Sequence, residues 1–169
     1  MDPLVISLVT RRVRVGLISD THGLLRPEAV EALRGSDFIV HAGDVGDAAI
    51  LQALAALAPV TAVRGNNDRG PWATALPEVS TLVAGGTRIH VVHDRATIDP
   101  ARWQDVDVVV AGHSHRALIE WRERVLFVNP GSAGPRRFSL PVSVADLVIV
   151  GERVTPRVIT LSRLQPALP

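Results

Sequence analysis

The sequence predicts a single domain of the α/β class, and three observations lead to this prediction. The chain has 169 residues, of which 47% are hydrophobic and 21% charged, a size and composition that suit one domain with a sizeable core. Its first third alternates apolar β-branched runs with helical patterns, which is typical of parallel βαβ units. Its second half is a succession of short apolar runs separated by turns, which indicates strands. We expect one domain over residues 1–169, with residues 1–12 as a candidate N-terminal extension.

The first third contains three expected strands and two expected helices. Residues 13–19 are apolar and largely β-branched, and they end at a polar turn, as a buried strand does. Pro27 suits the first turn of a helix and Gly35 its end. Asp47 is placed to cap a second helix, whose apolar residues recur at helical spacing. The expected order is strand 13–19, helix 27–33, strand 38–40, helix 47–58 and strand 60–63.

The second half is expected to be rich in strands. Gly85 and Gly86 suit a hairpin turn between strands 79–83 and 88–92, and a final hairpin is expected around Gly151. The remaining expected strands are 107–111, 118–121, 125–128, 142–150 and 154–160. Because functional loops of parallel sheets lie beyond the carboxyl ends of the strands, the polar turns that follow these strands are the place to look for a site.

Composition excludes several kinds of chemistry. The absence of cysteine excludes disulfides and thiolate ligands, and the absence of lysine excludes Schiff-base and P-loop lysine chemistry. A net charge of +1 does not indicate a nucleic-acid partner. The apolar runs are too short to span a membrane, and residues 4–9 lack the pattern of a secretory signal. We therefore expect a cytoplasmic protein with no membrane partner.

Seven residues with metal-binding side chains follow the expected strands. They are Asp20, His22, Asp44, Asn66, His93, His113 and His115. Residues two apart in an extended segment point to the same side, so Asp20 with His22, and His113 with His115, can each face one site. Imidazole and oxygen ligands suit Mn, Fe, Zn or Ni. Two such ions about 3.5–4 Å apart would activate a bridging hydroxide to attack phosphorus in line with the leaving group.

Each piece alone has an ordinary structural explanation. A Gly-Asp pair at a strand end is commonly a turn or a helix cap, and paired histidines often line a polar loop. A single histidine in a strand, such as His93, is commonly a partly buried residue with a hydrogen-bond partner. The occurrence of all the pieces in one order favours a metal site.

In this order the motifs DxH, GDxxD, GNxD, a lone His and GHxH resemble the signature of the calcineurin-like metallophosphoesterases, over residues 13–132. The chain is most similar to small phosphodiesterases of the YfcE type, which also carry a sequence like the NPGS at 129–132. The resemblance implies a four-layer αββα sandwich, with two mixed β-sheets flanked by helices. It also implies a metal-dependent phosphoesterase, and first of all a phosphodiesterase, with a small phosphoester as substrate.

The resemblance also implies a role for each ligand position. The first divalent ion would be held by Asp20, His22 and His115. The second would be held by Asn66, His93 and His113. Asp44 would bridge the two ions, for which Mn is the first expectation and Fe, Zn or Ni are alternatives.

Three further residues are candidate catalytic residues. Many family members have histidine where this chain has Asn67, whose amide can donate a hydrogen bond to a phosphoryl oxygen but cannot supply a proton. We therefore expect weaker activity on poor leaving groups, or another proton donor. Asp68 is expected to orient ligands as an acceptor. Arg95 follows His93 where the family often has a second histidine, and it could meet a substrate phosphate.

Neighbouring polar residues receive lesser roles. His41 is expected to support the ligands at most, and His90 has the opposite strand parity to His93, so it should face away from the metals. Asn129 is expected to tie down a site loop through its side-chain amide. Arg64 and Arg69 could bind phosphate or simply be exposed to solvent.

Two other functions stay open at this point. One is a non-catalytic scaffold, like the retromer subunit that shares this fold. The other is a protein with a single structural metal in closed coordination. The physiological substrate, the preference for diesters or monoesters, and the formation of a homodimer are also open.

Overall fold

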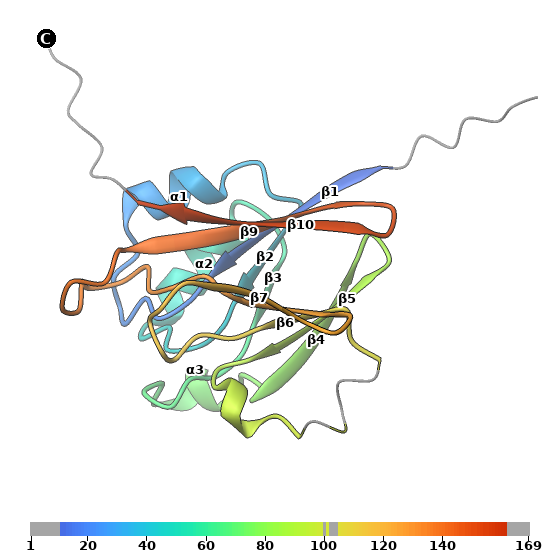
Figure 1. Ribbon diagram of the computed structural model, residues 1–169. Helices are drawn as coiled ribbons and strands as arrows, with labels where there is room; N and C mark the ends of the chain where they lie inside the picture. Colours follow the sequence, from blue (N-terminus) through green and yellow to red (C-terminus); the bar gives the residue numbers. More distant parts are fainter. Residues whose placement is uncertain (1–10, 100, 102–104, 162–169) are drawn as a thin grey trace, which may run out of the picture.

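The computed structural model describes residues 11–99, 101 and 105–161, and the strands in these residues form two five-stranded sheets (Figure 1). The first sheet has the order β10-β9-β1-β2-β3. Strands β1, β2 and β3 are parallel, whereas β9 runs antiparallel to both β1 and β10. The bounds are β1 Arg12–Ile18, β2 Phe38–His41, β3 Val60–Ala62, β9 Ser143–Val150 and β10 Arg153–Thr160.

The second sheet has the order β4-β5-β6-β8-β7. Its central strands β5, β6 and β8 are parallel, and the outer strands β4 and β7 pair antiparallel with β5 and β8. The bounds are β4 Val79–Ala84, β5 Thr87–Val92, β6 Val108–Val110, β7 Leu118–Arg122 and β8 Val125–Asn129. Both sheets are therefore mixed, as the resemblance implied.

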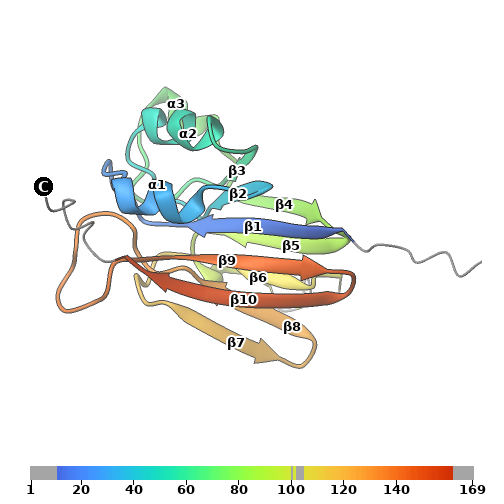
Figure 2. The same ribbon diagram turned by 90° about the horizontal axis from the view of Figure 1, so that it is seen from above.

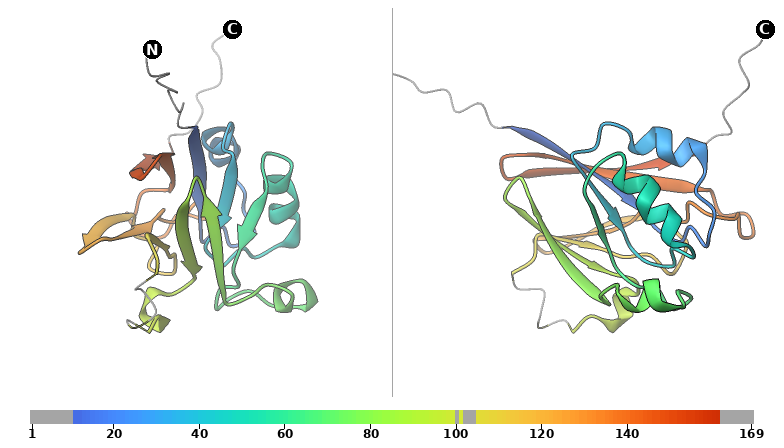
Figure 3. Two further views of the ribbon diagram at one scale, coloured as in Figure 1. Left: turned by 90° about the vertical axis from the view of Figure 1, so that its right-hand side faces the viewer. Right: turned by 180° about the vertical axis from the view of Figure 1, so that it is seen from behind.

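Three short helices and one 3₁₀ turn accompany the sheets. They are α1 Pro27–Leu33, α2 Ala48–Ala55, α3 Pro71–Thr74 and the 3₁₀ turn Arg95–Thr97. The helices lie on the side of the first sheet (Figure 2), and Figure 3 shows α1 and α2 in front of it in the right-hand view. On the side of β6, β7 and β8, the described residues contribute only the 3₁₀ turn. The expected sandwich of two mixed sheets is confirmed. Its described α-helices cover the first sheet and not the second. None of the described helices is long and apolar enough to cross a membrane.

Most of the expected elements are confirmed within a residue or two. Helix α1 begins at Pro27 and ends at Leu33, and Asp47 caps α2 by accepting a hydrogen bond from the Ala49 backbone at 2.8 Å. Helix α2 ends three residues before the expected end, and α3 and the 3₁₀ turn were not expected. The expected extension at residues 1–12 lies outside the described residues except for Arg11 and Arg12, and Arg12 begins β1.

Alternation along the strands builds the core between the sheets. Val13, Val15 and Leu17 of β1 face the second sheet, where Val110 and Leu126 belong to the same buried cluster. The opposite face of the first sheet packs on the helices, with Leu33 and Leu54 fully buried. A third cluster, Val106, Val109, Val125 and Phe127, lies on the outward face of the second sheet.

A buried carboxylate links β1, β9 and β10. Asp146 has no exposed surface, and it accepts hydrogen bonds from Arg14 Nε at 2.9 Å and Arg157 Nη2 at 2.6 Å. The other guanidinium nitrogens of Arg14 donate to the carbonyls of Ala32 and Arg34 at the end of α1. Arginine at a helix C-terminus satisfies carbonyls that lack helical partners. This network fixes α1 against the strand that leads into the first polar turn.

Candidate metal centre

The polar turns after the strands hold their side chains in an unusual backbone conformation. Of the seven described non-glycine residues with positive φ, five are metal-ligand candidates, with φ between 46° and 66°: Asp20, His22, Asp44, His113 and His115. This left-handed region is unfavourable by about 1–3 kcal/mol for such residues, and non-glycine residues held in it cluster at functional sites. Asp20 and His22 do face one site, as expected, but the expected reason, an extended backbone, was wrong. Both lie in a turn that brings them together.

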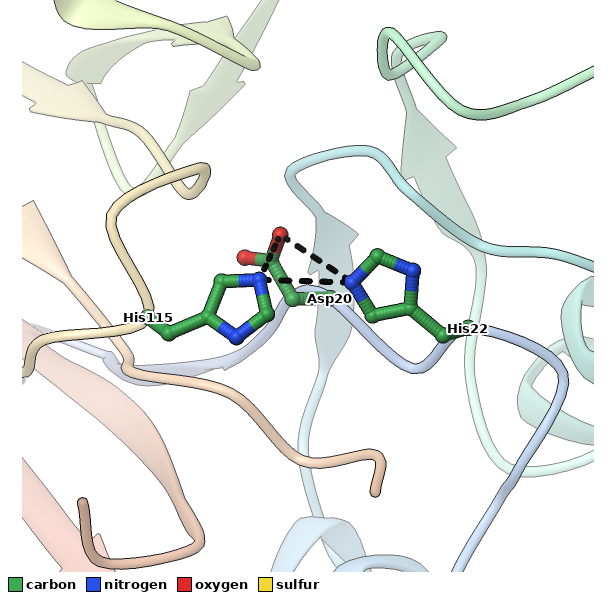
Figure 4. Close-up of side chains that lie close together, drawn as sticks. All are labelled: Asp20, His22 and His115. Carbon is green, nitrogen blue, oxygen red and sulfur yellow. Dashed lines mark hydrogen bonds and ion pairs between the residues drawn. The ribbon is translucent and has the colours of Figure 1, made fainter. Parts of the chain in front are cut away.

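Asp20, His22 and His115 form the first cluster (Figure 4). Asp20 Oδ1 lies 3.2 Å from His115 Nε2 and 3.9 Å from His22 Nε2, and the two imidazole nitrogens are 3.3 Å apart. Gly112 makes this approach possible, since a Cβ on it would overlap the Ser19 hydroxyl. These residues come from the turns after β1 and β6.

Asn66, His93 and His113 form the second cluster. Asn66 Oδ1 lies 2.9 Å from His93 Nε2 and 3.1 Å from His113 Nδ1. The Nδ1 of His93 is 2.8 Å from the Ala42 carbonyl oxygen, so Nδ1 carries the proton and Nε2 is left with its lone pair toward the site. His113 and His115 are thus divided between the two clusters, although they are only two residues apart.

Asp44 lies between the two clusters. Its Oδ2 is 3.4 Å from His93 Nε2 and 3.8 Å from His22 Nε2. Burial raises the pKa of Asp44, but the adjacent His93 ring and the hydrogen bonds from Asn67 outweigh burial and hold this pKa well below its usual range. The carboxylate therefore stays ionised near neutral pH, as a bridging ligand must.

The side chains fit divalent metal ions. Two buried side-chain atoms of the described residues have no hydrogen-bond partner, Asp20 Oδ1 and His115 Nδ1. The other oxygen of Asp20 accepts from the Ser19 hydroxyl at 2.7 Å and from the His113 backbone at 3.1 Å. Burial raises the pKa of Asp20 and lowers the pKa of His115, because it disfavours the charged form of each. A cation beside Asp20 Oδ1 would satisfy an oxygen that the protein leaves free.

A family model for the calcineurin-like phosphoesterase superfamily domain matches residues 13–151, which include both clusters and Asp44. The chain belongs to this superfamily. A probable metallophosphoesterase of Methanothermobacter thermautotrophicus is 35% identical to this chain over 158 residues, or 86% of this chain and 91% of that protein. The expected family is therefore confirmed.

Solved structures share the fold of this calcineurin-like phosphoesterase. Vacuolar protein sorting 29 of Cryptosporidium parvum has a TM-score of 0.78 at 23% identity, covering 90% of this chain and 93% of that one. A novel archaeal phosphodiesterase has a TM-score of 0.74 at 23% identity, covering 88% and 100%. The phosphoesterase YfcE of E. coli has a TM-score of 0.64 at 21% identity, covering 89% and 100%. At these identities the likeness shows the fold.

Asn67 holds the Asp44 carboxylate in place. Its backbone N–H donates to Asp44 Oδ1 at 2.8 Å and its side-chain Nδ2 donates to Asp44 Oδ2 at 2.7 Å. Asn67 therefore orients Asp44, and this bond uses one of the two hydrogens of its side-chain amide, so the expected contact with a substrate phosphate stays a prediction. The turn that carries Asn67 lies over the loop of Asp44, which is 23 positions earlier in the sequence.

Asp68 joins two of the loops that carry candidate ligands. Its Oδ1 accepts from the Gly46 backbone and its Oδ2 from the Gly65 backbone, both at 2.8 Å, and the residue is 4% exposed. It therefore ties the loop of Asp44 to the loop of Asn66. It is a positioning residue, and it contacts the ligand loops through their backbone amides.

Arg95 lies at the edge of the site in the 3₁₀ turn. Its Nη1 is 3.3 Å from Glu120 Oε2 on β7, and Glu120 is also held by Arg122. The expected contact between Arg95 and a substrate phosphate therefore competes with this ion pair. His90 is paired with Thr81 across β4 and β5, at 3.4 Å from its hydroxyl, and it takes no part in either cluster.

His41 supports the ligand loops through backbone and hydroxyl contacts. Its ring is fully buried, Nε2 lies 2.9 Å from the Thr21 hydroxyl, and Nδ1 accepts from the Gly43 backbone at 3.2 Å. The Thr21 hydroxyl donates to the Val45 carbonyl, so it must accept from His41, which fixes the proton on Nε2. This neutral histidine joins the loops of Asp20 and Asp44. Burial lowers its pKa to about 3.

Of the other supporting residues, the sequence predicted Asn129 but not the two serines. Asn129 donates to the Gly112 carbonyl at 2.8 Å and to the Ser114 hydroxyl at 3.1 Å, which confirms that it ties down the loop of the paired histidines. Ser19 and Ser132, which contact Asp20, were missed. A serine has no distinguishing pattern, and only its position next to a ligand motif could have indicated Ser19.

A hollow of about 650 Å³ opens beside the second cluster. Asn66, His93 and His113 line it together with Arg64 and Arg69. Arg64 is paired with Glu78, and Arg69 donates to the Asn66 carbonyl, so both arginines have protein partners. The second cluster is therefore open to this hollow.

Proposed function

We propose that this protein is a phosphodiesterase that hydrolyses a small phosphodiester with two divalent metal ions, Mn first among them. The observation that carries the proposal is the position of Asp44. An ionised carboxylate lies between two clusters that each contain nitrogen and oxygen donors. The first ion would be held by Asp20, His22 and His115, and the second by Asn66, His93 and His113.

When bound, such a pair of ions neutralises phosphoryl oxygens and lowers the pKa of a water molecule so that it can act as nucleophile. The side chains prepare the site for this chemistry. His93 presents Nε2 because the Ala42 carbonyl holds its Nδ1 proton. Asn67 fixes both oxygens of Asp44, so the carboxylate keeps one orientation when a substrate binds.

The side chain of Asn67 cannot protonate a leaving group. An amide is not an acid near neutral pH, and this amide is already bonded to Asp44. We therefore propose that the enzyme favours esters whose leaving group departs as a stable anion. A phosphodiester with a nitrophenyl leaving group should be hydrolysed much faster than an otherwise identical phosphodiester with an alkyl leaving group.

The test combines metal analysis with hydrolysis. Purified protein loaded with Mn should contain two ions per chain, hydrolyse bis(p-nitrophenyl) phosphate and lose this activity with a chelator. Asp44→Asn should lower kcat/KM by about three orders of magnitude, the size expected when a group that organises the reacting centre is removed. Asp47→Asn is the matched control, since asparagine caps helices about as well as aspartate and Asp47 is outside both clusters.

The results separate this proposal from the two other functions. Two bound ions without turnover of any phosphoester would favour a non-catalytic scaffold. One tightly bound ion, with Asp44→Asn as stable and as active as wild type, would favour a structural metal. A wild-type rate that persists in the chelator would contradict the proposed function directly.

A further inference from the structure

A second hollow, of about 420 Å³, adjoins the metal centre on the outward face of the second sheet. His113 lines this hollow as well as the hollow beside Asn66 and His93, so the two meet at the second cluster. The described helices lie on the other side of the molecule (Figure 2). Among the described residues the 3₁₀ turn Arg95–Thr97 is the only helical element on this face, and the hollow lies between it, β6, β7 and β8.

The walls of the second hollow are largely apolar. Val109 and Phe127 come from outward-facing positions of β6 and β8, and Leu118 comes from β7. The Arg122 guanidinium lies over the ring of Phe127, 5.1 Å from its centroid. Such walls favour a ligand with an apolar face, and the volume falls within the range of about 300–1,000 Å³ typical of small-molecule sites.

The rim of the second hollow carries polar groups with unused bonding capacity. The Ser114 hydroxyl accepts from Asn129 Nδ2 at 3.1 Å and from the Arg116 backbone at 3.3 Å, so its own proton can be donated to a ligand. The Arg116 guanidinium makes no hydrogen bond or ion pair with the described residues. A free guanidinium at the mouth of an apolar hollow can stack on an aromatic ring.

We propose that the second hollow binds an aromatic arm of the phosphodiester, a nucleobase or a ring like it, while the phosphate lies at the metal centre. A nucleobase has apolar faces, which suit Val109, Leu118 and Phe127, and a polar edge, which the Ser114 hydroxyl can meet. Arg116 covers its exposed face. This inference rests on the proposed function and names the class of substrate, a phosphodiester with a nucleoside arm.

The test measures binding, so it does not depend on turnover. Adenosine 5′-monophosphate and inorganic phosphate are titrated into the Mn-loaded protein by calorimetry, and the ratio of their affinities reports the contribution of the arm. We expect the nucleotide to bind at least about tenfold tighter than phosphate, which corresponds to about 1.4 kcal/mol. Ala96→Trp, which fills the hollow, and Leu118→Asp, which places a charge in its wall, should each bring this ratio close to one.

Matched controls lie elsewhere on the surface. Ala53→Trp places the same large side chain on an exposed position of α2, and it should keep the wild-type ratio. Arg116→Gln should lower the nucleotide affinity about threefold to tenfold, as expected for a lost cation–π contact, whereas Arg124→Gln in the exposed β7–β8 turn should not. Comparing the two arginine variants removes the general effect of lost positive charge.

The outcomes separate the hollow from the chemistry. Equal affinities for the nucleotide and phosphate in the wild type, or an unchanged ratio in both Ala96→Trp and Leu118→Asp, would overturn the proposal even if bis(p-nitrophenyl) phosphate is hydrolysed. A ratio that falls in both variants supports the hollow as the arm site. If that fall occurs in a protein without hydrolytic activity, the hollow stands as a nucleotide site and the proposed hydrolase is wrong.

Discussion

Replacing Asp68 by asparagine tests whether the ligand loops are held together by one buried carboxylate. Asp68 accepts from the Gly46 and Gly65 backbones at 2.8 Å each, and these glycines belong to the loops that carry Asp44 and Asn66. Asparagine has nearly the same shape, but one of its two acceptors becomes an amide group. In the Asp68→Asn variant this group points its hydrogens at a backbone N–H.

The magnitude follows from these two bonds. A hydrogen bond to a charged group contributes about 1.5–3 kcal/mol, and a buried N–H left without an acceptor costs about 1–3 kcal/mol. Asparagine keeps one of the bonds, so we expect the free energy of unfolding to fall by about 2–4 kcal/mol. Since the loops position metal ligands, Mn affinity should fall about 10- to 100-fold, the usual effect of removing a group that orients ligands.

Two measurements check this prediction. Urea unfolding followed by circular dichroism, with a chelator present, gives the stability of the metal-free protein, and Mn titration gives the affinity. Asp47→Asn, in the same loop as Asp44, should stay within about 0.5 kcal/mol of wild type, because its cap on Ala49 is preserved. If Asp68→Asn is equally stable and binds Mn as tightly as wild type, Asp68 does not hold the loops.

Three further predictions concern the support of the site and the core. His41 has a pKa lowered to about 3 by burial, so between about pH 3 and 6.5 the unfolded chain binds one more proton than the folded protein. Relative to His41→Gln, the wild-type free energy of unfolding should fall by about 1.4 kcal/mol per unit as pH drops through this window; parallel pH profiles of the two proteins would contradict this. Gly112→Ala should abolish tight Mn binding in calorimetry, because the new Cβ overlaps the Ser19 hydroxyl, and a wild-type affinity would show that this approach is not needed. Asp146→Ala should lower the free energy of unfolding by about 3–5 kcal/mol in urea, since it leaves two guanidinium groups without their carboxylate, whereas Glu120→Gln on the surface should change it little.

Much of the fold could be predicted because its signals are local. The apolar run of β1 ends at a polar turn, and Pro27 marks the first turn of α1, so both elements were found close to their observed bounds. Helix α3 was missed because its four residues are too few to show a helical period. Such short helices depend on tertiary packing for their stability, which local sequence does not reveal.

The supporting contacts of the site could not be predicted in the same way. Asn67, Asp68 and Arg95 were identified as important, but each bonds to a residue more than 20 positions away or on another loop. Those partners depend on which turns lie side by side after folding. The same reason explains why the partners of His41 were not predicted, since its bond to Thr21 joins two turns that the sequence keeps 20 residues apart.

By itself the sequence determined the residue types of the metal centre, the motifs that carry them and the family to which the chain belongs. These are properties of short segments, and each motif directly follows its strand. The resemblance implied how the ligands are divided, and only the tertiary structure decided which turns produce this division and what each ligand faces. Left-handed turns send His113 and His115 to different clusters, and parallel pairing of β1 with β2 brings Asp44 between them. The physical reason is that a side chain's neighbours depend on turn geometry and strand register, and these depend on the packing of the whole domain.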